Sequence, residues 1–160
     1  MAYCGTLLMC LGRNPLVGSN PTSSAANEIR MEMTNEELIE KARSIVKPKK
    51  MRHGFTTADC ACVLVTEKGN VYLGVSIDTS SSMGFCAERS ALAAMVTNQE
   101  FKIKKIVAVL EDGTVLSPCG VCREFMYQID RDNLDADVIV EKDKVVKLKD
   151  LLPFPWDESL

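Results

Sequence analysis

The two stretches Cys86-Ala87-Glu88 and Pro118-Cys119-Gly120-Val121-Cys122 organise the rest of the chain. The first places a thiol two residues before a carboxylate, and the second places two thiols three residues apart, directly after a proline. Three thiolates can hold one Zn²⁺ ion and leave its fourth coordination position open. Water at an open position becomes a nucleophile near neutral pH. The two stretches therefore predict a zinc site with Cys86, Cys119 and Cys122 as ligands.

Each stretch is also predicted to open a helix. Cys86 precedes an alanine-rich segment that runs to about Val96, and Pro118 precedes a segment with apolar residues at helical spacing. Backbone N–H groups and the helix dipole at such positions stabilise a thiolate and lower the pKa of the thiol. Three thiolates leave the zinc complex with a net negative charge. We therefore expect the adjacent Arg89 to donate hydrogen bonds to them.

Glu88 stands too close to Cys86 to be explained by a purely structural metal site. Its carboxylate can take a proton from water at the open position and return it to a leaving group. By themselves, Cys119 and Cys122 would also fit a redox pair or half of a structural zinc site. A structural site needs a fourth ligand, and neither His53 nor the remaining cysteines stand at an obvious spacing.

The remaining periodicity predicts a mixed sheet with helices on both faces. Thr34 and Glu37 form a helix-capping signature, and Pro48 ends the helical pattern that follows. A hairpin followed by a strand–helix–strand alternation favours an α/β fold with about five strands. The predicted helix spans 35–46, the predicted strands span 58–66, 71–75, 103–110, 137–140 and 144–148, and a small-polar loop spans 76–85.

Composition favours one globular domain in a reducing compartment. The chain has 160 residues, of which 46% are hydrophobic, enough for one well-packed core. A net charge of −3 gives no basic footprint for nucleic acid, so no nucleic acid partner is expected. No apolar run reaches the length of a membrane span, so no membrane partner is expected either. The seven cysteines are an odd number, which disfavours a disulfide framework and favours a cytoplasmic location.

The first part of the chain differs in composition from the rest. Residues 1–33 contain isolated glycines, two Asn-Pro steps and a small-polar run. We expect this segment to be a disordered extension, or an upstream frame with translation starting at Met31 or Met33. Residues 34–160 then form the single folded domain.

The two stretches, with Ser117 and Arg123 beside the second and Leu151-Leu152-Pro153 near the end, resemble the zinc-dependent cytidine deaminase superfamily. The resemblance covers about residues 35–160 and is to the small members with three cysteine ligands. It implies a three-layer α/β/α fold, one zinc ion per subunit and a homotetramer with active sites formed between subunits. It also implies that Glu88 shuttles protons while a cytosine nucleoside loses ammonia, giving uridine or deoxyuridine.

The same resemblance supplies the candidate substrate contacts. Ala87 follows the first zinc ligand, and Phe55 matches a pocket phenylalanine of the family. Ser76 and Asp78 stand where cytidine deaminases carry an Asn-x-Glu pair that grips the ribose. In such assemblies a C-terminal aromatic can reach a neighbour's pocket, and the candidates for that role are Phe154 and Trp156.

Ser76 and Asp78 depart from the Asn-x-Glu pattern of cytidine deaminases. This departure leaves the expected reaction unchanged but leaves the identity of the substrate open. Serine cannot offer an amide's donor and acceptor together, and aspartate reaches less far than glutamate. The alternative substrates are blasticidin S and other cytosine derivatives. An alternative of another class is a non-catalytic zinc module used for assembly, in which Glu88 would have no task.

Overall fold

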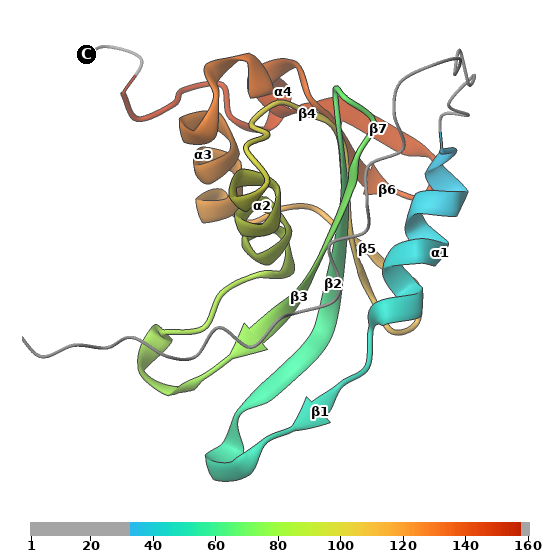
Figure 1. Cartoon of the computed structure of the whole chain (residues 1–160), viewed down its shortest axis with the longest axis vertical. Coiled ribbons are helices and arrows are strands. Elements are labelled where there is room, and N and C mark those ends of the chain that lie inside the picture. Colours follow the sequence, from blue (N-terminus) through green and yellow to red (C-terminus); the bar gives the residue numbers. More distant parts are fainter. Residues whose placement is uncertain (1–32, 158–160) are drawn as a thin grey trace, which may run out of the picture.

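A mixed sheet separates two layers of helices in the computed structural model, which describes residues 33–157 (Figure 1). The helices are α1 (Asn35–Ile45), α2 (Ala87–Thr97), α3 (Gly120–Ile129) and α4 (Leu148–Leu151), with 3₁₀ turns η1 (Arg52–Gly54), η2 (Ser80–Ser82) and η3 (Arg131–Asp135). The strands are β1 (Lys49–Lys50), β2 (Thr56–Thr66), β3 (Val71–Asp78), β4 (Ile103–Leu110), β5 (Val115–Leu116), β6 (Asp137–Glu141) and β7 (Lys144–Lys147).

The five longer strands lie in the order β3-β2-β4-β6-β7, and the two-residue strands β1 and β5 pair with β2 and β4. Only β4 and β6 run parallel, and every other pair is antiparallel. The parallel pairing is brief, because it covers only Lys105 with Asp137 and Ile106 with Val138. Beyond these residues β5 takes over the same edge of β4, so β4 and β6 diverge.

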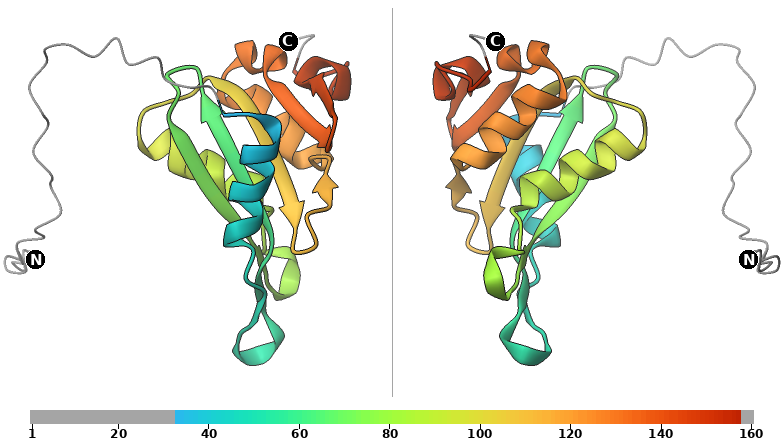
Figure 2. Two further views of the ribbon diagram at one scale, coloured as in Figure 1. Left: turned by 90° about the vertical axis from the view of Figure 1, so that its right-hand side faces the viewer. Right: turned by 90° about the vertical axis from the view of Figure 1, so that its left-hand side faces the viewer.

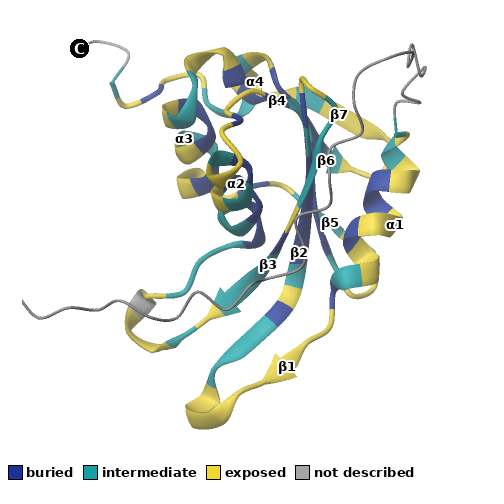
Figure 3. Ribbon diagram, viewed as in Figure 1, coloured by how far each residue is buried: buried dark blue, intermediate teal, exposed yellow. Residues whose placement is uncertain are grey.

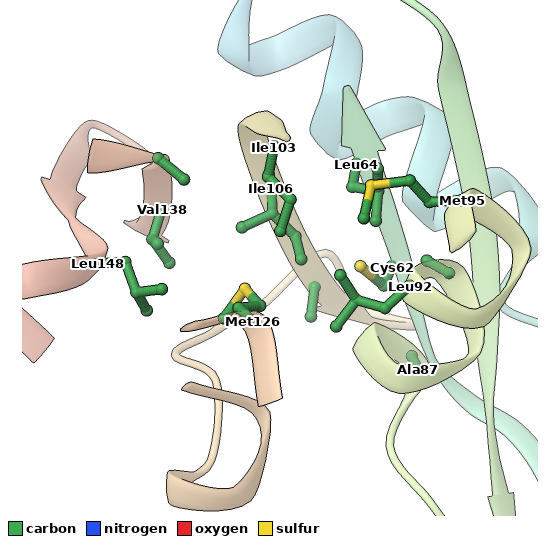
Figure 4. Packing of buried hydrophobic residues seen from close by; sticks show 13 residues of the cluster. Cys62, Leu64, Ala87, Leu92, Met95, Ile103, Ile106, Met126, Val138 and Leu148 are labelled. Atoms are coloured by element: carbon green, nitrogen blue, oxygen red, sulfur yellow. The ribbon is translucent and has the colours of Figure 1, made fainter. Parts of the chain in front are cut away.

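Side chains along the central strands alternate between the two faces of the sheet, so each face contributes to a separate hydrophobic core. In β2, Cys62 and Leu64 face α2, while Ala61 and Val63 face α1. Figure 3 shows buried residues along the inner sides of the helices and exposed residues along their outer sides. Figure 4 shows the larger core, with Met126 from α3 and Leu148 from α4 packed toward Ile106 and Val138. The prediction of a mixed α/β sheet covered on both faces is confirmed.

Helix α1 covers the second face of the sheet. It combines a capped N-terminus with an apolar stripe that faces the sheet. Thr34 and Glu37 form the predicted capping box, in which each side chain accepts a hydrogen bond from the other's backbone N–H. The buried side chains Leu38, Ile39 and Ala42 then lie on one stripe. Figure 2 shows α1 on one face of the sheet, with α2 and α3 on the other.

Two predicted boundaries were wrong at the edge of the sheet nearest the site. Strand β3 runs to Asp78, so Ser76 and Asp78 lie in the strand and not in a loop. Strand β2 begins at Thr56, and a register shift between Thr57 and Ala61 absorbs an irregularity at Ala58, whose φ is +59°. The sequence offered no sign of this bulge, because a left-handed alanine is rare.

Strand β1, η1 and the start of β2 form an arm that extends away from the helices (Figure 1). His53 and Gly54 both adopt positive φ angles, 64° and 81°, which turn the chain back on itself. Neither the arm nor α4 was predicted, because both are too short to display a hydrophobic period. Within residues 33–157, no helix combines the length and apolar character needed to cross a lipid bilayer. The expectations for residues 1–32 lie outside the described residues.

Candidate active site

Three sulfur atoms gather where the starts of α2 and α3 meet. The Cys86 and Cys119 sulfurs lie 3.6 Å apart, the Cys119 and Cys122 sulfurs lie 3.5 Å apart, and all three lie within 4.8 Å of one another. Sulfurs bound about 2.3 Å from one tetrahedral Zn²⁺ ion would be about 3.8 Å apart. The cluster therefore has the dimensions of a zinc site, and its soft donors favour zinc over magnesium or calcium.

Both helices present a cysteine at the N-cap position, as predicted. Cys86 caps α2 and Cys119 caps α3, each with an extended backbone, while Cys122 lies within the first turn of α3. Cys122 is buried, Cys86 is half-buried and Cys119 is exposed. The metal position is thus enclosed on one side and accessible on the other, which suits a catalytic ion better than a closed structural one.

Of the three thiols, only Cys119 has a lowered pKa, so the lowering expected at both helix starts does not occur at Cys86. Burial raises the pKa of the Cys86 thiol, and the contact with Cys119 adds to this effect. Burial also raises the pKa of Cys122, and the nearby Glu88 carboxylate raises it further. Burial opposes ionisation of Cys119 as well, but the backbone N–H of Cys122 and the neighbouring thiols stabilise its thiolate, so its pKa is lowered overall.

Glu88 lies in the first turn of α2 and is only 5% exposed. Burial raises the pKa of its carboxyl, and its own backbone N–H, the Cys122 thiol and Arg89 offset part of that effect. The side chain lines a narrow crevice with residues of the diverging strands β4 and β6 and with Pro118. A carboxyl so placed stands beside the sulfur cluster, where β4 and β6 diverge.

A family profile described as the cytidine and deoxycytidylate deaminase zinc-binding region matches residues 33–135. The match spans more than half of the chain and includes all three cysteines and Glu88. The chain belongs to this family. Its members' zinc-binding region thus coincides with the cysteine cluster that the fold assembles, so the predicted zinc cofactor is confirmed at the level of the family.

Curated relatives and solved structures agree with this membership. The chain is 33% identical over 100 residues to a cytidine deaminase of Mycoplasma genitalium, covering 61% of this chain and 75% of the relative. It is 35% identical over 96 residues to a cytidine deaminase of Mycoplasma pneumoniae, covering 58% and 71%. The cytidine deaminase structure from Burkholderia pseudomallei matches 78% of this chain and 100% of its own, with a TM-score of 0.63 and 26% identity.

The start of α2 in this deaminase-family chain is held against β3 by a glycine. A Cβ atom at Gly74 would lie 2.3 Å from the Ala87 carbonyl oxygen and 2.3 Å from the Ala91 nitrogen. Only glycine permits so close an approach of strand and helix backbones. Gly74 thereby sets the position of Cys86 and Glu88. Sequence reasoning missed it, although a glycine within a β-branched strand signals close backbone approach.

Arg89 lies behind the cysteine cluster. Its Nη2 donates a hydrogen bond to the Gly84 carbonyl oxygen at 3.4 Å, and its guanidinium carbon lies 5.6 Å from the centre of the Phe85 ring. Its Nε is buried and has no hydrogen-bond partner among residues 33–157. The structure therefore places Arg89 against the loop that delivers Cys86, with one buried donor still available.

Of the candidate ribose contacts, Ser76 takes part in a hydrogen bond within the sheet. Its hydroxyl accepts a hydrogen bond from the Cys60 backbone N–H at 3.0 Å, which satisfies the donor left free by the bulge in β2. Burial raises the pKa of the Cys60 thiol to about 12, and the charges of Glu88 and Cys86 contribute. Asp78 ends β3 opposite Thr56, at the base of the arm.

The aromatic candidates do not line the cluster within one chain. Phe55 directly follows η1 on the arm, with its ring centroid 6.5 Å from that of His53. Phe154 and Trp156 follow α4 and are 85% and 64% exposed. Ala87, in contrast, is fully buried beneath the first turn of α2. These exposed rings can act at a substrate site only if they contact another molecule.

Proposed function

We propose that this chain catalyses the hydrolytic deamination of a free cytosine nucleoside, converting cytidine or deoxycytidine to the uridine form and ammonia. The observation that carries the proposal is a buried carboxyl, Glu88, two residues from one of three thiols with the spacing of a zinc site. The names of the Mycoplasma relatives support the same substrate class.

In this proposal Cys86, Cys119 and Cys122 hold one zinc ion per subunit. When bound there, zinc supplies a Lewis acid that lowers the pKa of water. Glu88 takes the proton from the attacking water and returns protons to the pyrimidine ring and the departing amino group. Its burial keeps bulk water from competing with these transfers. The free Nε of Arg89 is the donor that offsets the excess thiolate charge.

The site is completed by other copies of the chain in a homotetramer. The crevice beside Glu88 is too narrow to admit a water molecule, whereas ligand pockets begin at about 300 Å³. The exposed rings of Phe154 and Trp156 are of the kind that would close a neighbour's pocket, and Phe55 on the arm is a third. We place the enzyme in the cytoplasm, since the described cysteines are all free thiols.

The substrate contacts are where this chain differs from cytidine deaminases. Ser76 and Asp78 face the ribose in this proposal, with Ala87 against the base. Because the Ser76 oxygen already accepts a hydrogen bond from the Cys60 N–H, it has its proton and only one remaining lone pair for the ribose. This favours a looser grip on the sugar and keeps blasticidin S and other cytosine derivatives as alternative substrates.

Two substitutions test the assignment directly. Glu88→Ala is expected to retain one zinc per chain and the parent fold while losing deamination, because only the proton carrier is removed. Cys119→Ala is expected to lose zinc, measured by atomic absorption on the purified protein. Retained turnover in Glu88→Ala would exclude the proton-shuttle role and favour a non-catalytic zinc module.

A substrate panel then fixes the specificity. Cytidine, deoxycytidine, cytosine and blasticidin S are compared by the loss of cytosine absorbance, with ammonia release measured in parallel. We expect the nucleosides to be turned over fastest. Turnover of blasticidin S alone would reassign the substrate while leaving the zinc chemistry intact.

A further inference from the structure

The Arg123 side chain joins the loop that carries two of the proposed zinc ligands to the C-terminal segment. Its Nε donates to the Pro118 carbonyl oxygen at 2.7 Å, and its Nη2 donates to the Ser117 hydroxyl at 3.4 Å. Its Nη1 donates to the Leu151 carbonyl oxygen at 3.0 Å. One guanidinium group thus bonds both to its own loop and to a residue 28 positions further along the chain.

One end of this hydrogen-bonded link lies next to the thiols of the proposed zinc site. Pro118 and Ser117 directly precede Cys119, and the Arg123 backbone N–H donates to the Cys119 carbonyl oxygen at 3.1 Å. Pro118 is buried, so the loop cannot relax into solvent without losing that packing. The position of Cys119 therefore depends on where the guanidinium of Arg123 is held.

The other end of the link lies next to the aromatic C-terminal tail. Leu151 is the last residue of α4, where carbonyl groups lack partners within the helix. Arg123 satisfies one of them, and it does so with a charged donor, which makes a stronger hydrogen bond than a neutral one. Phe154 and Trp156 follow within five residues and are mostly exposed. The direction in which the tail leaves α4 is thereby tied to the start of α3.

We propose that Arg123 is a positioning residue that couples zinc binding at Cys119 and Cys122 to the presentation of the Phe154–Trp156 tail. The inference rests on the zinc ligands assigned above. When zinc draws the thiols together, the Pro118 carbonyl and the guanidinium bound to it are fixed, and the Leu151 carbonyl with them. When zinc is absent, the loop and the end of α4 loosen together.

A second arginine provides a matched comparison because it holds the same tail from another direction. Arg131 Nη2 lies 3.3 Å from the Asp157 carboxylate, and its guanidinium carbon lies 6.0 Å from the centre of the Tyr127 ring. Arg131 belongs to η3, and its guanidinium contacts the tail and Tyr127. Its loss should loosen the tail whether zinc is bound or not.

The experiment compares the full-length zinc-loaded parent with Arg123→Gln, Arg123→Lys and Arg131→Gln. Two properties are measured without substrate: the rate of zinc transfer to a chromogenic chelator, and the state of the tail. The tail is followed by the emission of Trp156, the chain's single tryptophan, and by chymotrypsin cleavage after Trp156. Each tail measurement is made before and after zinc removal.

In the parent, removing zinc is expected to shift the Trp156 emission and to speed cleavage of the tail. Arg123→Gln is expected to release zinc about tenfold faster, the usual minimum for losing an outer partner of a metal ligand. With or without zinc, its Trp156 emission and its rate of tail cleavage should match those of the zinc-free parent. Arg123→Lys keeps the charge but cannot form the three-way fork, so it should fall between the two. Arg131→Gln should release zinc at the parent rate and keep the zinc-dependent change.

Two results would overturn the inference. One is a parent whose tail emission and cleavage do not change when zinc is removed. The other is an Arg123→Gln variant, or an Arg123→Lys variant if the first does not fold, that keeps both the parent zinc-release rate and the parent zinc-dependent change. Because no substrate is used, a coupled but inactive protein would contradict the proposed function alone.

Discussion

Replacing Gly74 with alanine should disable the site from the opposite side of α2. The added Cβ would lie 2.3 Å from two backbone atoms of the helix, the Ala87 oxygen and the Ala91 nitrogen, and 2.9 Å from the Ser90 Cβ. Ordinary carbon contacts begin near 3.5 Å. Because backbone atoms cannot rotate away, the start of α2 must move from β3 by about 1 Å.

That displacement has two separable consequences. Forcing one methyl group into a packed contact costs about 1–3 kcal/mol, which lowers the melting temperature of a chain this size by roughly 3–10 °C. Cys86 and Glu88 move with α2, whereas Cys119 and Cys122 remain with α3. Metal–ligand distances tolerate only about 0.2 Å, so zinc affinity should fall. A misplacement of about 1 Å should cost roughly 100-fold in kcat/KM.

Scanning calorimetry, zinc content and cytidine turnover measure these effects on one preparation. Gly120→Ala is the control for stability, because a Cβ there meets nothing within 4 Å and the same glycine entropy is removed. Its melting temperature should stay within about 2 °C of the parent. A Gly74→Ala protein with the parent melting temperature and full zinc content would refute the packing of α2 on β3 described above.

Three further substitutions test other parts of the structure. Asn133→Ala should cost about 3 kcal/mol of unfolding free energy in denaturant titrations, because two buried backbone groups and one partly buried one lose their partner, whereas exposed Asn98→Ala should cost under about 1 kcal/mol; equal losses would contradict the buried role. The Thr66 hydroxyl, with Asn70 and Tyr72, lowers the pKa of Glu100 despite its burial. The ionised Glu100 carboxylate therefore stabilises the fold above its unfolded pKa, and this contribution is lost as the pH falls through its lower folded pKa. Glu100→Gln should lower the melting temperature at pH 7, and this difference should shrink as the pH falls below about 4. Cys60→Val should keep full zinc content, since Cys60 is not among the three thiols that lie within 4.8 Å of one another; zinc loss would make Cys60 a ligand.

The parts of the site that depend on local backbone could be predicted from sequence. Cys86 and Cys119 cap helices because of the residues beside them, and the alternation of β2 and β4 is visible in their composition. The meeting of the two helix starts could not be deduced from spacing alone, and the family resemblance supplied it. Gly74 and Arg123 were missed as positioning residues, because each acts on a segment that is distant in sequence.

The edge of the sheet near the site was predicted least well. Ser76 and Asp78 look like loop residues because they are small and polar, yet pairing with β2 extends the strand through both. The left-handed Ala58 and the bulge beside it depend on how β2 bends between β1 and β4. Such a bend is decided by tertiary contacts on both edges of the strand, and no single-residue preference encodes it.

The separation of the proposed zinc ligands along the chain would give the metal a role in folding as well. Cys86 and Cys119 are 33 positions apart and belong to helices that meet mainly at their starts. An ion shared between them closes a long loop of the polypeptide, much as a covalent cross-link would, and does so only in the folded state. The unfolding free energy then rises with the free zinc concentration, by about 1.4 kcal/mol for each tenfold increase above the dissociation constant. Cellular zinc supply would therefore govern how much of this protein persists, in addition to how much of it is active.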